Sequence, residues 1–394
     1  MSISVEEIRG NDSESVDGAA IATCLTSLAS FLDRYKPRVH RAEQEEHLQV
    51  YVEGLVSGVE RKSIEPIATA HGLYRRPLQH FVGAGAWSDD KMRTEMRDHV
   101  VREIGDPKGV FILDGSGNKK QGADSVGVAR QYCGRLGKID NCQIGIYLAY
   151  STPKGFTLLD TDLYLPEEWA NDPARRRKTY VPEEVEFRTN WQIADDLIRR
   201  ASPHIPHEWI VGDDEYGRPT EFRDGLADRS ERYLLEVPCN TIVRRPLNWP
   251  GRARKWCSVK TRKERQPSDK WERFRLRDGE KGPIEVRAFS TRVETKRDRG
   301  TREETLLVME AVNGSQTWYF LAPGDVPLNT AELVRVAAHR HHIEQAFEFA
   351  KGECGLDHYE VRSWVGWHHH MTLSMLALWF LTLERRRLGK KHLH

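Results

Sequence analysis

The sequence predicts an α/β fold in which helices precede and follow a strand-rich middle. Before about residue 100, apolar residues recur at helical spacing, as at Leu48, Val52 and Leu55. From about residue 108, β-branched and aromatic runs are broken by Gly and Pro, which is typical of strands. After residue 330 the helical spacing returns. We therefore expect a mixed sheet with flanking helices.

The first hundred residues are expected to be helical, after a polar tail over 1–20. Within them, a helix over 64–70 and a second beginning near Arg75 are joined at Gly72, which resembles a helix-turn-helix. The second helix would then present four polar side chains to a DNA groove. These are Arg75, Arg76, Gln79 and His80. A small helical bundle without DNA contact explains the same pattern, so both interpretations stay open.

Four strand-like runs follow, namely KGVFILDGSG, SVGVARQYCG, CQIGIYLAYS and FTLLDTDLYLP. Their connections are short, which favours an antiparallel meander. The remaining elements, in order, are an amphipathic helix over 187–201, a strand in EWIVGDDEYGR, short strands over 233–321, a long helix over 331–354 and a final helix over 364–388.

The charge is balanced overall but not along the chain. The 394 residues contain 60 Lys and Arg and 59 Asp and Glu, a formal net charge of +1. Between Arg244 and Arg302, 20 Lys and Arg face 8 Asp and Glu, a net charge of +12. Trp249, Trp256 and Trp271 lie in this basic block. Cations that neutralise phosphates, beside rings that stack on bases, favour a nucleic-acid partner. A solvated, highly charged β-sheet surface is the alternative.

The composition disfavours several classes of protein. The length allows two or three domains, and a hydrophobic content of 39% argues against a disordered chain. The six Cys form no C-x-x-C pair and are too sparse for a disulfide scaffold. The N-terminus has no secretory pattern, and the longest apolar stretch, about 371–383, is shorter than the ~20 residues that span a membrane. We expect a cytoplasmic protein with reduced thiols and no membrane contact.

Three carboxylates are candidates for a metal site. Asp114 ends the apolar run 110–113, Asp213 follows the run 209–212, and Glu344 lies on the helix after the basic block. A carboxylate that ends a buried strand is costly unless it is paired or binds a cation. Three hard oxygen ligands suit Mg²⁺, and two such ions can activate an attacking oxygen and stabilise a leaving one.

Each acidic residue also has an interpretation that involves no metal ion. A lone Asp at a strand end is more often a cap or a turn residue than a ligand. Periodicity alone does not separate Asp213 from Asp214. Asp160 and Asp162 also follow apolar residues, but they precede a loop bounded by Pro and are expected at turn or edge positions.

Three longer blocks of the sequence contain the three candidate carboxylates, one in each block. They are FILDGSGNKKQGADSVGVARQYCGRLGKIDNCQIGIYLAY, WIVGDDEYGR and HRHHIEQAFEFAKGECGLDHYEVRSWVGWHHH. These blocks resemble the three catalytic blocks of bacterial insertion-sequence transposases of the DDE type. The stretch IEPIATAHGLYRRPLQHFV also resembles the region before their catalytic domain. In this family the second Asp stands three residues before an aromatic, here Tyr216, which selects Asp213.

The resemblance implies an RNase H-like catalytic core with two additions. The ranges are 101–235 and 326–394 for the core, 236–325 for a basic β-rich insertion and 1–100 for a helical DNA-binding region. The implied catalytic residues are Asp114, Asp213 and Glu344, which would also bind two Mg²⁺ or Mn²⁺ ions. The implied activity is cleavage at insertion-sequence ends, followed by joining of the 3′-hydroxyl to target DNA. A homodimer would hold the transposon ends and target DNA, in the bacterial cytoplasm and its nucleoid.

Further residues are candidates for DNA contact. Related transposases have the signature Y-(2)-R-(3)-E-(6)-K, which Arg340, Glu344 and Lys351 fit, whereas Ala337 replaces the Tyr. On one helix Arg340, Glu344 and Lys351 share a face, so both cations could grip a phosphate near the cut. Ordinary pairing along the helix is the alternative. The other candidates are Lys119 and Lys120 after the first Asp, and Arg254, Lys255 and Trp256 in the basic block. For these the alternatives are solvated charge and strand packing.

Two other functions remain in view. The chain could be a catalytically silent DNA-binding protein derived from a transposase, which Ala337 favours and the intact carboxylates disfavour. It could also be an RNase H-like nuclease without strand transfer, against which the +12 block argues. The clusters of His at 339–342 and 368–370 lack zinc-ligand spacing. They are expected to pack on helix faces or to contact DNA.

Overall fold

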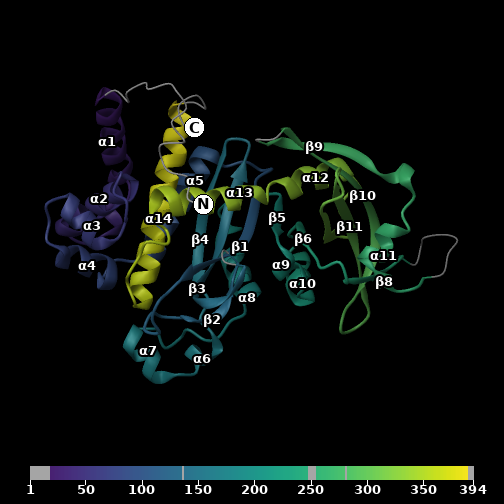
Figure 1. Ribbon diagram of the computed structural model, residues 1–394, viewed down its shortest axis with the longest axis horizontal. Coiled ribbons are helices and arrows are strands. Elements are labelled where there is room, and N and C mark those ends of the chain that lie inside the picture. Colours follow the sequence, from purple (N-terminus) through teal and green to yellow (C-terminus); the bar gives the residue numbers. More distant parts are fainter. Residues whose placement is uncertain (1–17, 135–136, 247–253, 280–281, 389–394) are drawn as a thin grey trace.

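The protein is described by a computed structural model over residues 18–134, 137–246, 254–279 and 282–388. Figure 1 shows α1 to α4 grouped at one end beside the long helix α14, a sheet in the middle, and a β-rich part at the other end. The N-terminal helices are α1 (Gly18–Asp33), α2 (Ala42–Val56), α3 (Ile64–Ala70), α4 (Arg75–Ala84) and α5 (Asp89–Ile104), with a 3₁₀ turn over Lys36–Arg38. The expected helical N-terminal region is thus present.

The pair α3 and α4 agrees with the predicted helix pair. Gly72 joins them with φ of +67°, a conformation that L side chains rarely adopt. The start of α4 is exposed, and Tyr74 retains 90% of its accessible surface. The opposite side is anchored because Leu78, Phe81 and Val82 are buried. An apolar inner face and a polar outer face suit a surface helix.

The described strands form one twelve-stranded sheet in the order β2-β3-β1-β5-β6-β12-β11-β10-β7-β8, with β4 on β3 and β9 on β10. The strands of the central part are β1 (Val110–Lys119), β2 (Ala129–Cys133), β3 (Lys138–Thr152), β4 (Gly155–Leu163), β5 (Trp209–Gly212) and β6 (Tyr233–Glu236). β3 runs antiparallel to β1, β2 and β4, whereas β5 and β6 are parallel to β1. The predicted α/β class with a mixed sheet and flanking helices is confirmed.

The β-rich part continues the same sheet rather than forming a separate one. Its strands are β7 (Ile242–Arg244), β8 (Cys257–Ser258), β9 (Glu272–Gly279), β10 (Gly282–Lys296), β11 (Thr301–Ala311) and β12 (Thr317–Pro323). β11 is buried on both faces: Leu306 and Val308 join a small second core, while Leu307 and Met309 join the main one. The chain enters this part after β6 and returns through β12, which pairs with β6.

Helices cover the central sheet. They are α6 (Glu167–Ala170), α7 (Pro173–Thr179), α8 (Asn190–Ala201), α9 (Asp214–Gly217), α10 (Thr220–Asp228), α11 (Val259–Glu264), α12 (Thr330–Ala338), α13 (His341–Cys354) and α14 (Trp364–Leu388), with a 3₁₀ turn over Ser268–Lys270. α14 is buried over most of its length. Its apolar residues surround the helix instead of forming a stripe, which is typical of a central core helix. Among the described residues, no helix is long and apolar enough to cross a membrane.

The prediction of one long helix over 331–354 is wrong in one respect, because the helix is divided at His339 and Arg340. There the backbone N–H groups bond to carbonyls three residues back rather than four, which tightens the turn. The Ser151 hydroxyl lies 3.0 Å from Nδ1 of His339 and 2.7 Å from Nδ1 of His342. These contacts from β3 hold the junction, and no Pro or Gly marks it in the sequence.

Asp160 and Asp162 lie within β4, not in a turn. Among the described strands β4 pairs only with β3, so the predicted edge position is confirmed. Both carboxylates are nevertheless buried, because α5 and α14 cover this strand. Arg97 lies 2.8 Å from Asp160, and His368 lies 3.0 Å from Asp162.

The adjacent residues His369 and His370 also bind within the core. The ring of His369 stacks on Trp87 with centroids 3.7 Å apart, and its nitrogens face the backbone carbonyls of Val82 and Trp87. His370 lies 2.8 Å from the Tyr51 hydroxyl and 3.0 Å from the backbone carbonyl of Gly355. Core packing, as expected from the helix faces, accounts for this cluster.

Candidate active site

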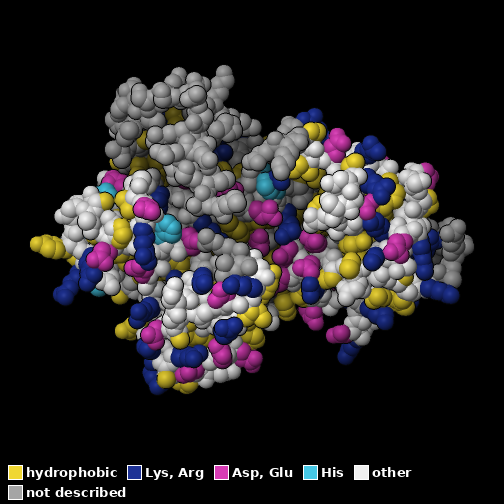
Figure 2. Space-filling view, viewed as in Figure 1, with side chains coloured by type: hydrophobic (Ala, Val, Ile, Leu, Met, Phe, Trp, Pro, Cys, Tyr) yellow, Lys and Arg dark blue, Asp and Glu magenta, His cyan; other side chains and the backbone are white. Residues whose placement is uncertain are grey.

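Three neighbouring strands carry a carboxylate at the same edge of the parallel part of the sheet. The parallel register of β1 and β5 stops at Leu113 and Gly212, so the next residues, Asp114 within β1 and Asp213 after β5, lie side by side. The next parallel pairing places Gly212 opposite Leu235 of β6, so Glu236 stands beside Asp213 in turn. Figure 2 shows Asp and Glu side chains gathered near the middle of the molecule, where Figure 1 places α9 and the ends of β5 and β6.

Local backbone contacts hold the two Asp side chains in place. An oxygen of Asp114 accepts a hydrogen bond from the N–H of Gly115 at 2.7 Å. Asp213 is the N-cap of α9, and its Oδ1 accepts from the N–H of Glu215 at 3.0 Å. An Asp at this position satisfies one of the free N–H groups that begin a helix. The cap interpretation of Asp213 is therefore correct, and it leaves Oδ2 turned to the site.

Arg340 reaches into this edge from the junction of α12 and α13. Its Nη1 lies 3.1 Å from Oε2 of Glu236, and its Nη2 lies 4.0 Å from Oδ2 of Asp213. Glu344, one turn further along α13, keeps 57% of its side chain exposed, and its Oε2 lies 3.3 Å from Nδ1 of His341. The three predicted catalytic carboxylates thus come from β1, the end of β5 and α13, around a single arginine.

The electrostatics of this edge are unfavourable for so many negative charges. Burial and the neighbouring carboxylate of Asp213 raise the pKa of Asp114 to about 7. Burial also raises the pKa of Asp213 and of Glu236, although the charge of Arg340 works against both shifts. Burial alone would lower the pKa of Arg340, but the surrounding carboxylates raise it. The carboxylates that do so are those of Asp114, Asp213, Glu236 and Glu344.

The donor set fits divalent cations of the hard type. Carboxylate oxygens are what Mg²⁺ and Mn²⁺ prefer, and a carboxyl whose pKa is raised gains stability from an added positive charge. Among the described residues, no three His, Cys, Asp or Glu side chains are gathered closely enough to hold one ion. Asp114 and Asp213 are the side chains that would hold such ions, with Glu344 joining them from α13.

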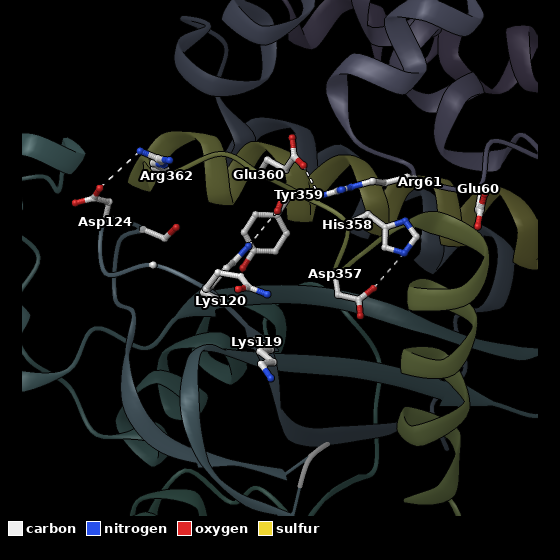
Figure 3. A pocket seen from close by; sticks show the side chains of 13 residues that line it. Glu60, Arg61, Lys119, Lys120, Asp124, Asp357, His358, Tyr359, Glu360 and Arg362 are labelled. Atoms are coloured by element: carbon white, nitrogen blue, oxygen red, sulfur yellow. Dashed lines mark hydrogen bonds and ion pairs between the residues drawn. The ribbon is translucent and has the colours of Figure 1, made fainter. Parts of the chain in front are cut away.

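Lys119 and Lys120, predicted to approach DNA, point in different directions. Lys119 keeps 57% of its side chain exposed and lies 3.6 Å from Asp140. Lys120 faces inward, as Figure 3 shows: its ammonium lies 3.0 Å from the carbonyl oxygen of Tyr359 and 3.4 Å from the centre of that ring. Burial lowers the pKa of Lys120 to about 8.

The cavity in Figure 3, of about 770 Å³, lies at the far end of β1 from Asp114. Its rim carries cations and acids that pair with each other. Arg61 binds Glu360, and Arg362 lies 3.7 Å from Asp124. Because charges of both signs are mixed around it, the cavity shows no preference for an anion or a cation.

The predicted DNA contacts of the basic block are divided between paired and exposed groups. Arg254 binds Glu294 at 2.7 Å, whereas Lys255 is exposed. The Trp256 ring has the guanidinium of Arg244 at 4.5 Å and the ammonium of Lys296 at 5.2 Å from its centre. Such contacts stabilise the indole within the β-rich part. On α13, Lys351 has its ammonium 5.6 Å from the centre of the Phe347 ring. Trp249 lies outside the described residues.

Glu236 is the carboxylate that sequence reasoning missed. It is the last residue of β6 (Tyr233–Glu236), and the three residues before it in this strand are buried. This is the same signal, an apolar run followed by an acid, that singles out Asp114 and Asp213. What the sequence does not reveal is that β6 lies directly beside β5.

Comparison with known proteins shows the family of this chain. A family model described as "DDE superfamily endonuclease" matches residues 34–295. The match covers more than half of the chain, and this chain belongs to that family. The family predicted from the sequence blocks is thereby confirmed. The matched range contains Asp114, Asp213 and Glu236 and ends before Glu344.

Two known proteins are similar to this chain. A probable transposase for insertion sequence element IS701 from Microchaete diplosiphon is 28% identical over 213 residues, 52% of each chain. The chain thus spans about half the length of this curated relative in the alignment. A piggyBac transposase, solved in a synaptic complex with hairpin DNA, has a TM-score of 0.41 and 10% identity over 92% of this chain and 72% of its own.

Proposed function

We propose that this protein is a DNA transposase that cleaves at insertion-sequence ends and joins the freed 3′-hydroxyl to target DNA. The carrying observation is that Asp114 and Asp213 lie side by side where the parallel pairing of β1 and β5 stops, and that both interact with Arg340 at the start of α13. Family membership supports the nuclease chemistry, and the relative from IS701 supports the use of that chemistry in transposition. Magnesium or manganese would activate the attacking water or hydroxyl and stabilise the leaving oxygen.

Each side chain has a distinct role in this proposal. Asp114 and Asp213 hold two ions from the sheet edge, and Glu344 closes the site from α13. Arg340 and Lys351 lie about three turns apart on the α12–α13 segment and contact phosphates beside the cut. Because the attacking oxygen comes from water or from DNA, the protein contributes position and charge and no covalent nucleophile.

Two surfaces would guide DNA to this site. One is the exposed start of α4, with Arg75 and Arg76. The other is β9, where Arg273 and Arg277 are exposed. β9 packs against α12, which places this strand near the start of α13. A homodimer would hold two DNA ends at once, in the bacterial cytoplasm.

The test is cleavage of a labelled DNA that carries the ends of the native element, in the presence of Mg²⁺. We expect the parent to cut at the ends and to join them to a second DNA, and the variant Asp213→Ala to bind without cutting. If both proteins bind the ends and neither cuts, the chain is a silent DNA-binding protein, which the replacement of Tyr by Ala337 favours. If the parent cuts without joining, it is a nuclease.

A further inference from the structure

Glu236 makes the shorter of the two contacts that Arg340 forms with carboxylates. The distance from Nη1 to Glu236 Oε2 is 3.1 Å, against 4.0 Å from Nη2 to Asp213 Oδ2. The first is a charge-assisted hydrogen bond and the second is only an ion pair. Arg340 therefore divides its charge unequally between a predicted metal ligand and a carboxylate without an assigned role.

The surroundings of Arg340 strengthen the effect of these two contacts on the site. The three side chains keep 22 to 26% of their surface, so water screens their charges incompletely. The backbone at Glu236 is fixed by its pairing with Phe320 of β12, and the residue before it, Leu235, also pairs with Gly212 of β5. Glu236 can thus serve as a rigid anchor, whereas Arg340 stands on the tightened turn between two helices.

We propose that Arg340 is the built-in counter-cation of the metal-free site, and that Glu236 is a positioning residue that holds Arg340 when a metal ion takes Asp213. The proposal rests on the metal-dependent function proposed above. With Glu236 present, the guanidinium can give up the 4.0 Å contact and keep the 3.1 Å one. Its Nη2 is then released from Asp213 and can bind a phosphate.

This arrangement makes metal binding depend on Arg340 before any DNA arrives. In Arg340→Gln, no internal cation competes for Asp213, so Mn²⁺ should bind about 10-fold tighter, equivalent to about 1.4 kcal/mol. In Glu236→Gln, the anchor is lost and Arg340 falls back on Asp213, so Mn²⁺ should bind about 5-fold weaker. The two neutral substitutions thus shift the affinity in opposite directions.

A direct role of Glu236 as a metal ligand is the competing explanation, and a double-mutant cycle separates the two. If Glu236 acts through Arg340, the effect of Glu236→Gln disappears in the Arg340→Gln background, apart from its long-range charge. The matched control for that charge is Glu215→Gln. Glu215 lies two residues from Asp213, and its side chain binds Asn190 rather than Arg340.

The experiment measures Mn²⁺ binding to the full chain without DNA, by the loss of the free-ion signal in electron paramagnetic resonance. The parent is compared with four single variants and one double variant. The single variants are Arg340→Gln, Glu236→Gln, Glu215→Gln and Asp213→Asn, and the double variant is Glu236→Gln/Arg340→Gln. Thermal melts confirm that each protein is folded. Opposite shifts in the two single variants, with the double variant binding Mn²⁺ as tightly as Arg340→Gln, support the proposal. It is overturned if Arg340→Gln binds Mn²⁺ no tighter, or if Glu236→Gln weakens binding equally in both backgrounds.

Failure of the underlying function looks different. Binding of Mn²⁺ that Asp213→Asn leaves unchanged would mean that this edge is no metal site, and both proposals would then be rejected. In another outcome, Asp213→Asn abolishes Mn²⁺ binding, and Glu236→Gln weakens it equally with Arg340 and with Gln at position 340. This outcome rejects only the role of Glu236 as a positioning residue.

Discussion

Two acidic clusters lie on the same sheet and are neutralised in opposite ways. At the edge of β1, β5 and β6, four carboxylates share the one cation of Arg340, and the pKa values of three of them are raised. Within β4, Asp160 is fully buried and has three arginines within 3.3 Å. These are Arg93, Arg97 and Arg200. Its neighbour Asp162 has Arg188 at 2.9 Å and His368 at 3.0 Å.

The acids of β4 are neutralised within the fold, whereas the charges of the acids beside β1, β5 and β6 are offset only in part. Burial alone would raise the pKa of Asp162, but the hydrogen bond from His368 and the charge of Arg188 hold it well below its usual range. In the first cluster, called the strand-end cluster below, Arg340 offsets the effect of burial only in part, so the charges are maintained at a cost to stability. Charge that is only partly compensated at one edge of a sheet is typical of a functional site.

The largest expected effect follows from removing one charge of the strand-end cluster. Asp213→Asn should lower DNA cleavage by at least about 10³-fold, about 4 kcal/mol, because a ligand of the catalytic ions is lost. The melting temperature should stay the same or rise, since Asn still caps α9 and one poorly compensated charge disappears. Cleavage rates and thermal melts of parent and variant test this. A marked loss of stability would mean that Asp213 is a structural acid.

The same substitution in β4 should have the opposite profile. Asp160→Asn leaves three arginines, of which Arg93 and Arg97 are buried, without their shared carboxylate, which should cost about 3–5 kcal/mol of unfolding free energy. Urea denaturation measures the loss. At a temperature where the variant remains folded, we expect its cleavage rate to be near that of the parent. Unchanged stability would remove the distinction between the two clusters.

His370 of α14 offers an intermediate case, a buried titratable group held by hydrogen bonds without an opposite charge. Burial lowers its pKa to about 3, while the unfolded imidazole has a pKa of about 6.5. The unfolded chain takes up the proton first, so the contribution of His370 is complete above pH 6.5 and is lost progressively as the pH falls towards 3. Between pH 8 and pH 5 the loss is about 2 kcal/mol.

The measurement is the free energy of unfolding in urea at both pH values for the parent and His370→Gln. The parent should lose about 2 kcal/mol more than the variant on moving to pH 5. Because other histidines titrate in both proteins, only the difference between the two profiles reports on His370. Parallel profiles would show that this imidazole is not held neutral in the fold.

The smallest effects are expected in the basic block, where neighbouring cations differ in their partners. Arg254→Ala removes the contact with Glu294 at 2.7 Å and should cost about 0.5–1 kcal/mol of stability. Lys255→Ala, at an exposed position, should leave stability unchanged and reduce the salt dependence of DNA binding by about one phosphate contact. Binding isotherms at several salt concentrations, with melts, compare the two. Equal effects of the two substitutions on stability and on DNA binding would show that the ion pair of Arg254 influences neither property.

The sequence was sufficient to single out Asp114 and Asp213 as candidates. Each follows an apolar run typical of a buried strand, whereas their place in one site was implied by the resemblance to DDE transposases. The final helix over 364–388 was likewise predictable because its apolar content leaves no polar face. In both cases the deciding information is local, within about ten residues of the position concerned.

Features that depend on distant partners could not be predicted. The burial of Asp160 depends on Arg97, which is 63 residues away in the sequence. The break between α12 and α13 depends on Ser151, nearly 190 residues before His339. The inward turn of Lys120 depends on Tyr359, 239 residues later. Composition and spacing give no information about such pairs, since they arise only when the sheet and α14 are assembled.

The central claim is that the strand-end cluster, and not the acids of β4, binds the catalytic ions. The most direct test is anomalous diffraction from crystals of the full chain with a DNA end and Mn²⁺. The account predicts anomalous peaks within about 2.0–2.3 Å of the carboxylate oxygens of Asp114 and Asp213. Peaks at other residues, or no peak at this edge in crystals of a preparation that cleaves DNA, would contradict it.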